Sequence, residues 1–483
     1  MNGPLIAKFL SFIMGIISLF MGGAALWGLA LGDRVGGLAA AMTLGLAFAG
    51  LLYAAGRFQT DYRAAGIRDG LLVVSLSWVF ASVIGALPFY ISGMTPTFTD
   101  AFFEAMSGFT TTGASILTDI EAHPQSLLFW RSLTHWIGGM GIIVLSLAIL
   151  PFIGVGGIHL LKAEVPGFGH EKMTPRLHQM ALRLWGVYMG LTGVLALLYL
   201  GGGMSLFDAL THAFSSVATG GLSPKNASIG HFNSPFIEWV TTLFMFLSGV
   251  NFALHYRFLL GQPGVYRRDE EFRLYGAIVA VCSLVAGAVL LRGGYYPTLE
   301  EALRRGAFHV VSIITSTGYC TADYQLWPVF IHIMFVLLIF AGACTGSTCG
   351  GLKTLRVLIL ARMAGRGPAS GLHPRGVFPV KVRGKAAGQD ITSSVTSFFI
   401  LYLAIFAAGA LFMAALGLDF ETAVTSAAAA LGNTGPGFGS VGPASNYFHI
   451  PAAGKWALSI LMLLGRLELY AVMLLFYPGT WRK

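Results

Sequence analysis

Charged residues are scarce in this sequence. Only 11% of the 483 residues are Asp, Glu, Lys or Arg, whereas 55% are hydrophobic. Soluble domains carry about 25% charged residues, so lipid must solvate most of this chain. The shortage of charge excludes an ordinary soluble protein, and the formal charge of +9 is too dispersed to indicate a nucleic-acid partner.

Cysteine is also scarce, and its spacing excludes two kinds of site. The four cysteines lie in or beside apolar segments without paired spacing, at Cys282, Cys320, Cys344 and Cys349. Disulfide frameworks and zinc sites need regular pairs of ligands. We therefore interpret these cysteines as structural.

Long apolar runs are abundant. A membrane-spanning helix needs about 20 apolar residues, and ten runs are long enough: 5–31, 36–56, 70–93, 126–152, 183–202, 236–260, 274–292, 328–361, 391–417 and 452–477. The first exceeds the roughly 7–15 residues of a cleaved signal segment, so we interpret it as a retained helix. The sequence predicts an all-α polytopic membrane protein with ten transmembrane helices.

The basic residues indicate an orientation. With both termini cytoplasmic, most of the 30 lysines and arginines fall on the cytoplasmic side, as the positive-inside rule requires. The opposite face then carries an excess of acidic residues. Such a face concentrates cations, although acids can also simply be tolerated there, and the sequence leaves both interpretations open.

A short Thr-Gly motif recurs four times. It appears as TTTGAS around Gly113, VATGGLS around Gly220, TSTGYC around Gly318 and GNTGPG around Gly435. Each copy follows a short segment that begins with acidic residues and is too short to cross a membrane. The predicted unit is a span, a half-membrane helix, a loop and a second span. Parallel repeats of this kind imply an axis along the membrane normal, with four loops around one pore.

The repeats divide the chain into five parts. These are a two-helix extension (1–66), pore repeat 1 (67–155), pore repeat 2 (156–265), pore repeat 3 (266–386) and pore repeat 4 (387–483).

Uncharged loops of this composition suit a monovalent cation. Irregular backbone at membrane depth is tolerated where it lines a water-filled path, and rings of backbone carbonyls replace the water around K⁺ in channels. A divalent ion would call for carboxylates, which the loops lack. The half-membrane helices would also direct their partly negative C-terminal ends at the ion path.

A second irregular stretch interrupts the eighth run. Residues 342–351 contain only small residues and include four glycines, each of which costs about 1 kcal/mol in a helix interior. An unwound loop that gates the pore and close helix packing through small residues are both compatible with this pattern. Lys353 follows directly. Arg466 and Glu468 lie inside the last run, where charges are functional candidates, and their spacing predicts separate partners.

Three stretches carry a resemblance to a known family. WIGGMGIIVLSLAILP (136–151), GSTCGGLKTLR and LLGRLELY resemble the Trk/Ktr/HKT superfamily of potassium transporters. The two additional N-terminal spans are similar to the TrkH branch. The resemblance implies fourfold pseudo-symmetric helix–pore loop–helix repeats and potassium uptake through a backbone-carbonyl selectivity filter.

The resemblance also implies roles for individual residues. The implied potassium-binding filter consists of Thr111, Thr112, Gly113, Ala218, Thr219, Gly220, Ser316, Thr317, Gly318, Asn433, Thr434 and Gly435. The implied gate consists of Gly346, Ser347, Thr348, Gly350, Gly351, Lys353, Arg466 and Glu468. Glycine rather than serine at Gly113 favours potassium over sodium.

The expected partners follow from the same resemblance. It implies a homodimer in a bacterial inner membrane, with one pore in each subunit, and a cytosolic TrkA-type nucleotide-binding regulatory subunit. The basic loops 162–183 and 353–385 are candidate docking surfaces, or else ordinary positive-inside charge. No tightly bound cofactor is expected, and K⁺ is the transported ion.

Two other functions compete with a passive pore. A secondary transporter coupled to H⁺ or Na⁺ would need a titratable group at mid-membrane, for which Glu468 and His135 are the candidates. An intramembrane enzyme would need a nucleophile with a base, and Ser347 and Thr348 have no histidine near them in the sequence. We expect a transporter and not an enzyme.

Overall fold

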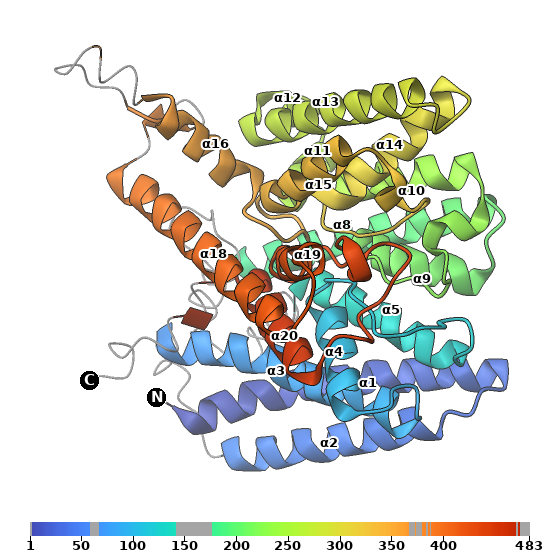
Figure 1. Cartoon of the computed structure of the whole chain (residues 1–483). Helices are drawn as coiled ribbons and strands as arrows, with labels where there is room; N and C mark the ends of the chain where they lie inside the picture. The colour runs from blue at the N-terminus through green and yellow to red at the C-terminus, as the bar shows by residue number, and fades with distance from the viewer. Residues whose placement is uncertain are drawn as a thin grey trace.

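The computed structural model describes residues 2–57, 67–141, 176–366, 379–382, 385–386 and 388–469, together with residues 372, 472 and 473. The regular secondary structure of these residues is almost entirely α-helical (Figure 1). Among them the only strands are β1 (Lys381–Val382) and β2 (Lys385–Ala386), an antiparallel pair with Lys381 opposite Ala386.

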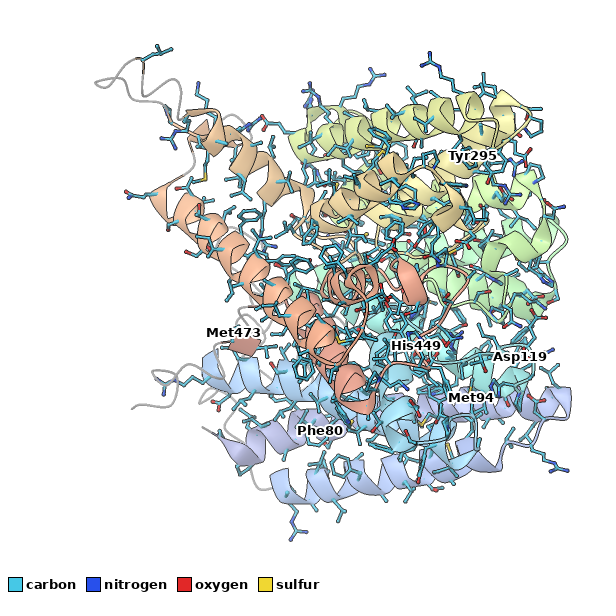
Figure 2. All side chains as sticks on the ribbon, in the orientation of Figure 1. Phe80, Met94, Asp119, Tyr295, His449 and Met473 are labelled. Atoms are coloured by element: carbon cyan, nitrogen blue, oxygen red, sulfur yellow. The ribbon has the colours of Figure 1, made fainter. Side chains whose placement is uncertain are left out.

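Six helices are long and apolar enough to cross a membrane. They are α1 (Gly3–Leu31), α2 (Gly36–Gly56), α3 (Ile67–Ile91), α8 (Arg176–Gly201), α13 (Glu270–Arg292) and α18 (Gln389–Ala415). Each coincides with a predicted run, and large apolar side chains such as Leu51, Leu197 and Leu411 are exposed on them. Figure 2 shows side chains projecting outward from these helices. Because water does not solvate such surfaces favourably, these helices make the chain a multi-span membrane protein.

Four helices are too short to cross. They are α4 (Phe98–Phe109), α9 (Leu206–Val217), α14 (Leu299–Ile314) and α19 (Phe420–Gly432), with 12 to 16 residues each. At 1.5 Å per residue they reach about 18–24 Å, short of a core roughly 30 Å thick. The four acid-led segments therefore form short helices, as predicted.

All four short helices begin in the same way. The side chain of the residue before each helix accepts a hydrogen bond from the backbone N–H three residues later, and these capping residues are Thr97, Ser205, Thr298 and Asp419. Such caps satisfy amides that the helix itself leaves unpaired. The sequence thus fixes each start locally.

The helix after each loop ends earlier than expected. These helices are α5 (Gln125–Gly139), α10 (Pro235–Ser248), α15 (Val329–Ala341) and α20 (Ala452–Arg466). The chain bends by 99° between α10 and α11 (Phe252–Leu259), and an irregular segment separates α15 from α16 (Thr354–Ala364). The run 236–260 is therefore not one unbroken helix, because the chain breaks at Gly249, and the unwound segment expected within the run 328–361 begins at Gly342. The parts 142–152, 470–471 and 474–477 of the other two runs lie outside the described residues.

Short elements complete the described chain. Helix α12 (Val265–Arg268) leads into α13, and three 3₁₀ turns (Ser228–Phe232, Tyr324–Leu326 and Gly439–Val441) lie between the loops and the helices that follow.

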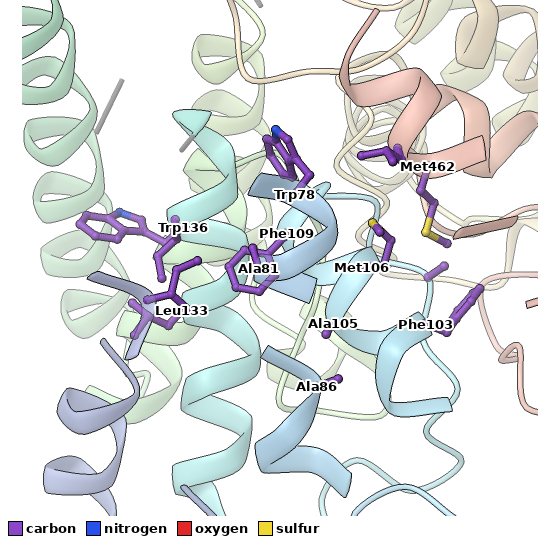
Figure 3. Packing of buried hydrophobic residues seen from close by; sticks show 14 of the residues in the cluster. Trp78, Ala81, Ala86, Phe103, Ala105, Met106, Phe109, Leu133, Trp136 and Met462 are labelled. Carbon is purple, nitrogen blue, oxygen red and sulfur yellow. The ribbon is translucent and has the colours of Figure 1, made fainter. Parts of the chain in front are cut away.

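Aromatic side chains pack the first short helix against its neighbours. The Phe109 ring of α4 lies between side chains of α3 and α5 (Figure 3) and meets the Trp130 ring edge-on, with 6.2 Å between centroids. The indole of Trp130 donates to the carbonyl of Gly85 at 3.1 Å. A Cβ at Gly85 would overlap the Phe109 ring, so glycine is needed for this close approach.

Two buried ion pairs join elements far apart in the sequence. Lys455 Nζ of α20 lies 2.6 Å from Asp100 Oδ1 of α4, and Glu238 of α10 pairs with both Arg304 and Arg305 of α14. Lys455 and Glu238 are each the fourth residue of their helices. Lys455 and Glu238 therefore occupy corresponding places in their helices and carry opposite charges.

Candidate functional site

The four short helices end in one shared backbone geometry. One or two residues after each helix end, a residue adopts a left-handed conformation with φ of 53–55°: Thr111, Thr219, Ser316 and Asn433. The following N–H bonds back to the carbonyl five residues earlier, at 2.8 Å for Thr112 and 2.9 Å for Gly220. This is the Schellman motif, which usually places glycine at the left-handed position. Threonine there is a strained choice.

This geometry corrects the alignment of the second loop. The residue two places after each left-handed residue is a glycine with φ of 77–86°: Gly113, Gly221, Gly318 and Gly435. The sequence-based alignment paired Gly220 with Gly113 and is therefore shifted by one residue. Ala218 lies at the level of Thr315, before the left-handed residue. The two successive glycines of the ATGG stretch made the Thr-Gly dipeptide a misleading marker.

The four loops touch in a closed ring. A Cβ at Gly113 would overlap the carbonyl oxygen of Gly220, and one at Gly221 would overlap that of Thr317. In the same way, a Cβ at Gly318 would overlap the carbonyl oxygen of Thr434, and one at Gly435 would overlap that of Thr112. Each loop therefore abuts the next, and the fourth returns to the first. A side chain at any of these glycines would enter the backbone of its neighbour.

The ring presents neutral oxygen atoms. Its members are threonine, serine, asparagine, glycine and their backbone carbonyls, and the side chains of Thr112, Thr317 and Thr434 are fully buried. The amide of Asn433 donates to Thr112 Oγ1 at 3.0 Å and to the carbonyl of Met462 at 2.9 Å. Hence the fourth loop is bonded both to the first loop and to α20.

The segment between α15 and α16 is irregular, as predicted. Gly342, Gly346, Gly351 and Lys353 all have φ between 64° and 79°, a conformation that excludes a continuous helix. The buried ammonium of Lys353 donates to the carbonyl of Cys349. The backbone is therefore non-helical from the end of α15 to the start of α16.

This segment contacts two of the loops directly. Thr219 Oγ1 donates to Thr348 Oγ1 at 3.1 Å, and the N–H of Gly350 donates to Ser316 Oγ at 2.8 Å. Both partners in the ring are left-handed residues. Their side chains connect the ring to the segment beside it.

Arg466 ties the segment to two other elements. One guanidinium nitrogen donates to the carbonyl of Thr348 at 2.5 Å, and the other donates to the carbonyls of Gly138 and Gly139 at 2.5 and 3.1 Å. The guanidinium also lies over the Trp78 ring, 5.6 Å from its centroid. Arginine suits such a place because its planar fork binds several acceptors while keeping its charge.

Glu468 has a partner of its own. It forms an ion pair with Arg356 of α16, and the guanidinium of Arg356 lies 4.0 Å from the centroid of the Phe398 ring. The expectation that Arg466 and Glu468 find separate partners is confirmed. Both Glu468 and Leu469 have positive φ, 53° and 57°, so the chain turns sharply where α20 ends.

Sequence reasoning missed Glu271. Its carboxylate is buried at the start of α13 and accepts hydrogen bonds from the N–H groups of Thr345 at 2.6 Å and Leu355 at 3.1 Å. One side chain thereby holds both sides of the irregular segment. The only signal in the sequence is an acidic residue in a first helical turn, which is too common to indicate this role.

His135 is fully buried between α5 and the second loop. Its Nδ1 lies 3.2 Å from Ser215 Oγ and accepts from the N–H of Leu222 at 3.4 Å. A Cβ at Gly220 would meet its ring. The histidine therefore packs directly behind the loop.

Long apolar helices, together with short helices whose ends meet in a ring of neutral oxygens, define a multi-span membrane transport protein. The TrkH family model, described as a cation transport protein, matches residues 39–273 and 296–481. The chain belongs to this family, as the sequence motifs predicted, and its relatives are transporters and not enzymes.

Named relatives match over most of the chain. The Trk system potassium uptake protein TrkH of Salmonella typhimurium is 40% identical over 419 residues, 86% of each chain. The protein of the same name from Escherichia coli K12 matches with the same identity and coverage. The crystal structure of the potassium transporter TrkH from Vibrio parahaemolyticus aligns with a TM-score of 0.90 at 35% identity and covers 100% of both chains.

Proposed function

We propose that this chain takes up K⁺ through the ring of four loops, which acts as a selectivity filter. The observation that carries the proposal is the closed contact of four loops with the same backbone geometry and only neutral oxygens. Carbonyl oxygens held in this way can replace the water shell of a monovalent cation. The names of the relatives, which describe potassium uptake, support the same ion.

We assign the proposed filter residues by the backbone register of the four loops. They are Thr111, Thr112, Gly113, Thr219, Gly220, Gly221, Ser316, Thr317, Gly318, Asn433, Thr434 and Gly435. Glycine at position 113 leaves no side chain between the first two loops, and the family resemblance implies potassium where this position is glycine and not serine. The C-terminal ends of the four short helices carry partial negative charge and would stabilise the ion.

The gate of this filter is the segment 342–353 together with Arg466. Thr348 supports this assignment because its hydroxyl bonds to Thr219 of the ring while its carbonyl bonds to Arg466. A fixed guanidinium beside the ion path also opposes cation passage by like-charge repulsion. Release of Arg466 from its three carbonyl acceptors would free the segment and open the path.

The larger arrangement is part of the proposal. Ten membrane crossings and four half-membrane helices form four repeats around one axis, with the divisions 67–155, 156–265, 266–386 and 387–483. The chain acts as a homodimer in a bacterial inner membrane, with both termini cytoplasmic, under control of a TrkA-type nucleotide-binding subunit. The basic loops 162–183 and 353–385 are the proposed docking surfaces, and residues 162–175, 367–371, 373–378 and 383–384 of these loops lie outside the described residues.

Ion flux in liposomes tests this function. The purified protein is reconstituted alone, and K⁺ and Na⁺ currents are measured at set voltages with and without a pH gradient. A current that reverses at the K⁺ Nernst potential is expected for a passive filter. A reversal potential that moves with pH or Na⁺ would instead indicate coupled transport, and it would overturn the passive mechanism.

Substitutions in the ring test the filter separately. Gly113→Ser and Gly318→Ser would each put a side chain into the carbonyl of the next loop, so we expect altered ion preference. Unchanged rate and ion preference in both variants would refute the filter assignment, whatever the reversal potential.

A further inference from the structure

Each short helix holds the chain that leaves its own loop through one polar side chain. We call the residues after each loop glycine the exit segment: 114–117, 222–225, 319–322 and 436–439. The holding side chains are Glu104, His212, His309 and Thr425. The first three lie seven residues before the left-handed residue of the same loop, so they occupy corresponding positions.

Glu104 differs from the other three because it is a carboxylate with several partners. Its Oε2 accepts from the N–H of Ile116 at 2.9 Å, and its Oε1 accepts from Ser115 Oγ at 3.0 Å and from Arg131 Nε at 2.6 Å. Glu104 is 1% exposed and Arg131 is 2% exposed. Charge-assisted bonds of this kind are short and strong.

Arg131 extends this connection to the second loop. Its Nη1 donates to the carbonyl of Ser223 at 2.8 Å, and the hydroxyl of Ser223 is in turn bonded to His212 at 2.9 Å. The bonds therefore run without a gap from Ile116 through Glu104 and Arg131 to Ser223. Two exit segments more than 100 residues apart in the sequence are joined by one buried ion pair.

The third loop has a related contact that stays within its own repeat. Arg305 of α14 donates to the carbonyl of Thr321 in the exit segment of that loop. Since α14 leads directly into this loop, the contact does not join two loops. The pair at Glu104 and Arg131 does join two.

We propose that Glu104 and Arg131 form a positioning pair that sets the separation of the first two filter loops and thereby their ion preference. The inference rests on the proposed filter function. The two side chains do not touch the ion path; they act through Ile116 and Ser223. A buried pair suits this task because removing one partner leaves an uncompensated charge, so the two exit segments cannot separate independently.

The test compares Glu104→Gln and Arg131→Lys with a matched control, Arg304→Lys. Arg304 is also a buried arginine in an ion pair, with Glu238, but among the described residues its hydrogen bonds go to Glu300 and Glu238 and to none of the loops. The K⁺ to Na⁺ permeability ratio is taken from reversal potentials in liposomes. Thermal unfolding in detergent is followed for each variant.

For Glu104→Gln we expect the permeability ratio to fall about tenfold, the change that about 1.4 kcal/mol of lost ion discrimination gives. Arg131→Lys keeps the charge but lacks the fork that reaches both Glu104 and Ser223, so its ratio should fall less. Arg304→Lys should lower thermal stability and leave the ratio unchanged. An equal loss of ratio in Arg304→Lys would overturn the inference.

A milder variant covers the case in which Glu104→Gln does not fold. Ser115→Ala removes one hydroxyl that bonds to Glu104 and leaves the ion pair intact, so a smaller fall in the ratio is expected. The positioning pair alone would be refuted by two results together. The permeability ratio would be unchanged in every variant at Glu104, Ser115 and Arg131 that folds, and Gly113→Ser would alter the ratio in the same assay. If Gly113→Ser also had no effect, the filter itself would fail.

Discussion

Gly221 offers the sharpest check of the filter register. The backbone assigns Gly221 to the same place as Gly113, whereas the Thr-Gly pattern assigns Gly220 there. Gly221→Ala puts a Cβ on a residue with φ of +79° and into the carbonyl of Thr317. Because the obstacle is backbone, no side chain can rotate away from it.

The expected fall in the K⁺ to Na⁺ permeability ratio of Gly221→Ala has two causes. A left-handed conformation costs an L-residue roughly 1–2 kcal/mol, and the displaced Thr317 carbonyl would no longer face the ion correctly. If these two changes together reduce the free-energy preference for K⁺ over Na⁺ by about 1.4 kcal/mol, the K⁺ to Na⁺ permeability ratio falls about tenfold. The ratio is measured by reversal potential in liposomes, with size-exclusion chromatography as the check on folding.

Gly220→Ala is the matched control. Gly220 does not have a positive φ, and its Cβ would press on the ring of His135, a side chain that can turn about its own torsions. We expect a lower melting temperature and a smaller fall in the permeability ratio than in Gly221→Ala, because Gly220→Ala introduces no backbone clash with the neighbouring loop. The reverse outcome, a reduced ratio in Gly220→Ala and a normal one in Gly221→Ala, would refute the backbone register and restore the alignment from sequence.

Three further predictions concern the gate and one helix cap. Thr348→Val removes the hydroxyl bonded to Thr219, which contributes about 1 kcal/mol, so K⁺ flux in liposomes should rise several-fold; a flux at the wild-type level would contradict the contact between gate and filter. Arg466→Ala should raise flux by more than Arg466→Lys, which keeps the charge but not the three carbonyl bonds; equal flux in both would mean that charge has no part in closure. Asp419→Ala removes the N-cap that bonds to the N–H of Thr422 and should lower stability by about 1 kcal/mol, while Asp419→Asn should not; equal melting temperatures would contradict the cap. Because hydrogen bonds from Thr422 lower the pKa of Asp419, the carboxylate's contribution to stability is present at neutral pH and is lost as the pH falls through that lowered pKa.

The sequence predicted the long helices well because a span requires continuous apolar length. The same criterion could not detect where a helix stops inside an apolar run. Hydropathy is high on both sides of Gly249 and Gly342, whereas the breaks at 249–251 and at 342 depend on backbone torsion. The prediction of an unwound segment at 342–351 succeeded because four glycines gave a local signal there.

Contacts between distant residues were beyond reach for a different reason. Arg466 and Gly138 are 328 residues apart, and nothing in either local sequence encodes that they meet. Glu104 was visible only as one more acid in a short helix, and Arg131 as a charge near the start of a span. The register of the second loop was missed because ATGG offers two glycines, and only the torsion angles distinguish them.

The opposed ion pairs have a consequence for how the repeats find their neighbours during folding. In the proposed division into repeats, Lys455 of the fourth meets Asp100 of the first, whereas Glu238 of the second meets Arg304 and Arg305 of the third. If the fourth repeat took the place of the second beside the third, Lys455 would face Arg304 and Arg305, and like charges would repel. Similar units within one chain can exchange places during assembly, and buried charges of fixed sign can select among otherwise similar partners. The two pairs thus distinguish correct from incorrect neighbours as the chain closes on itself.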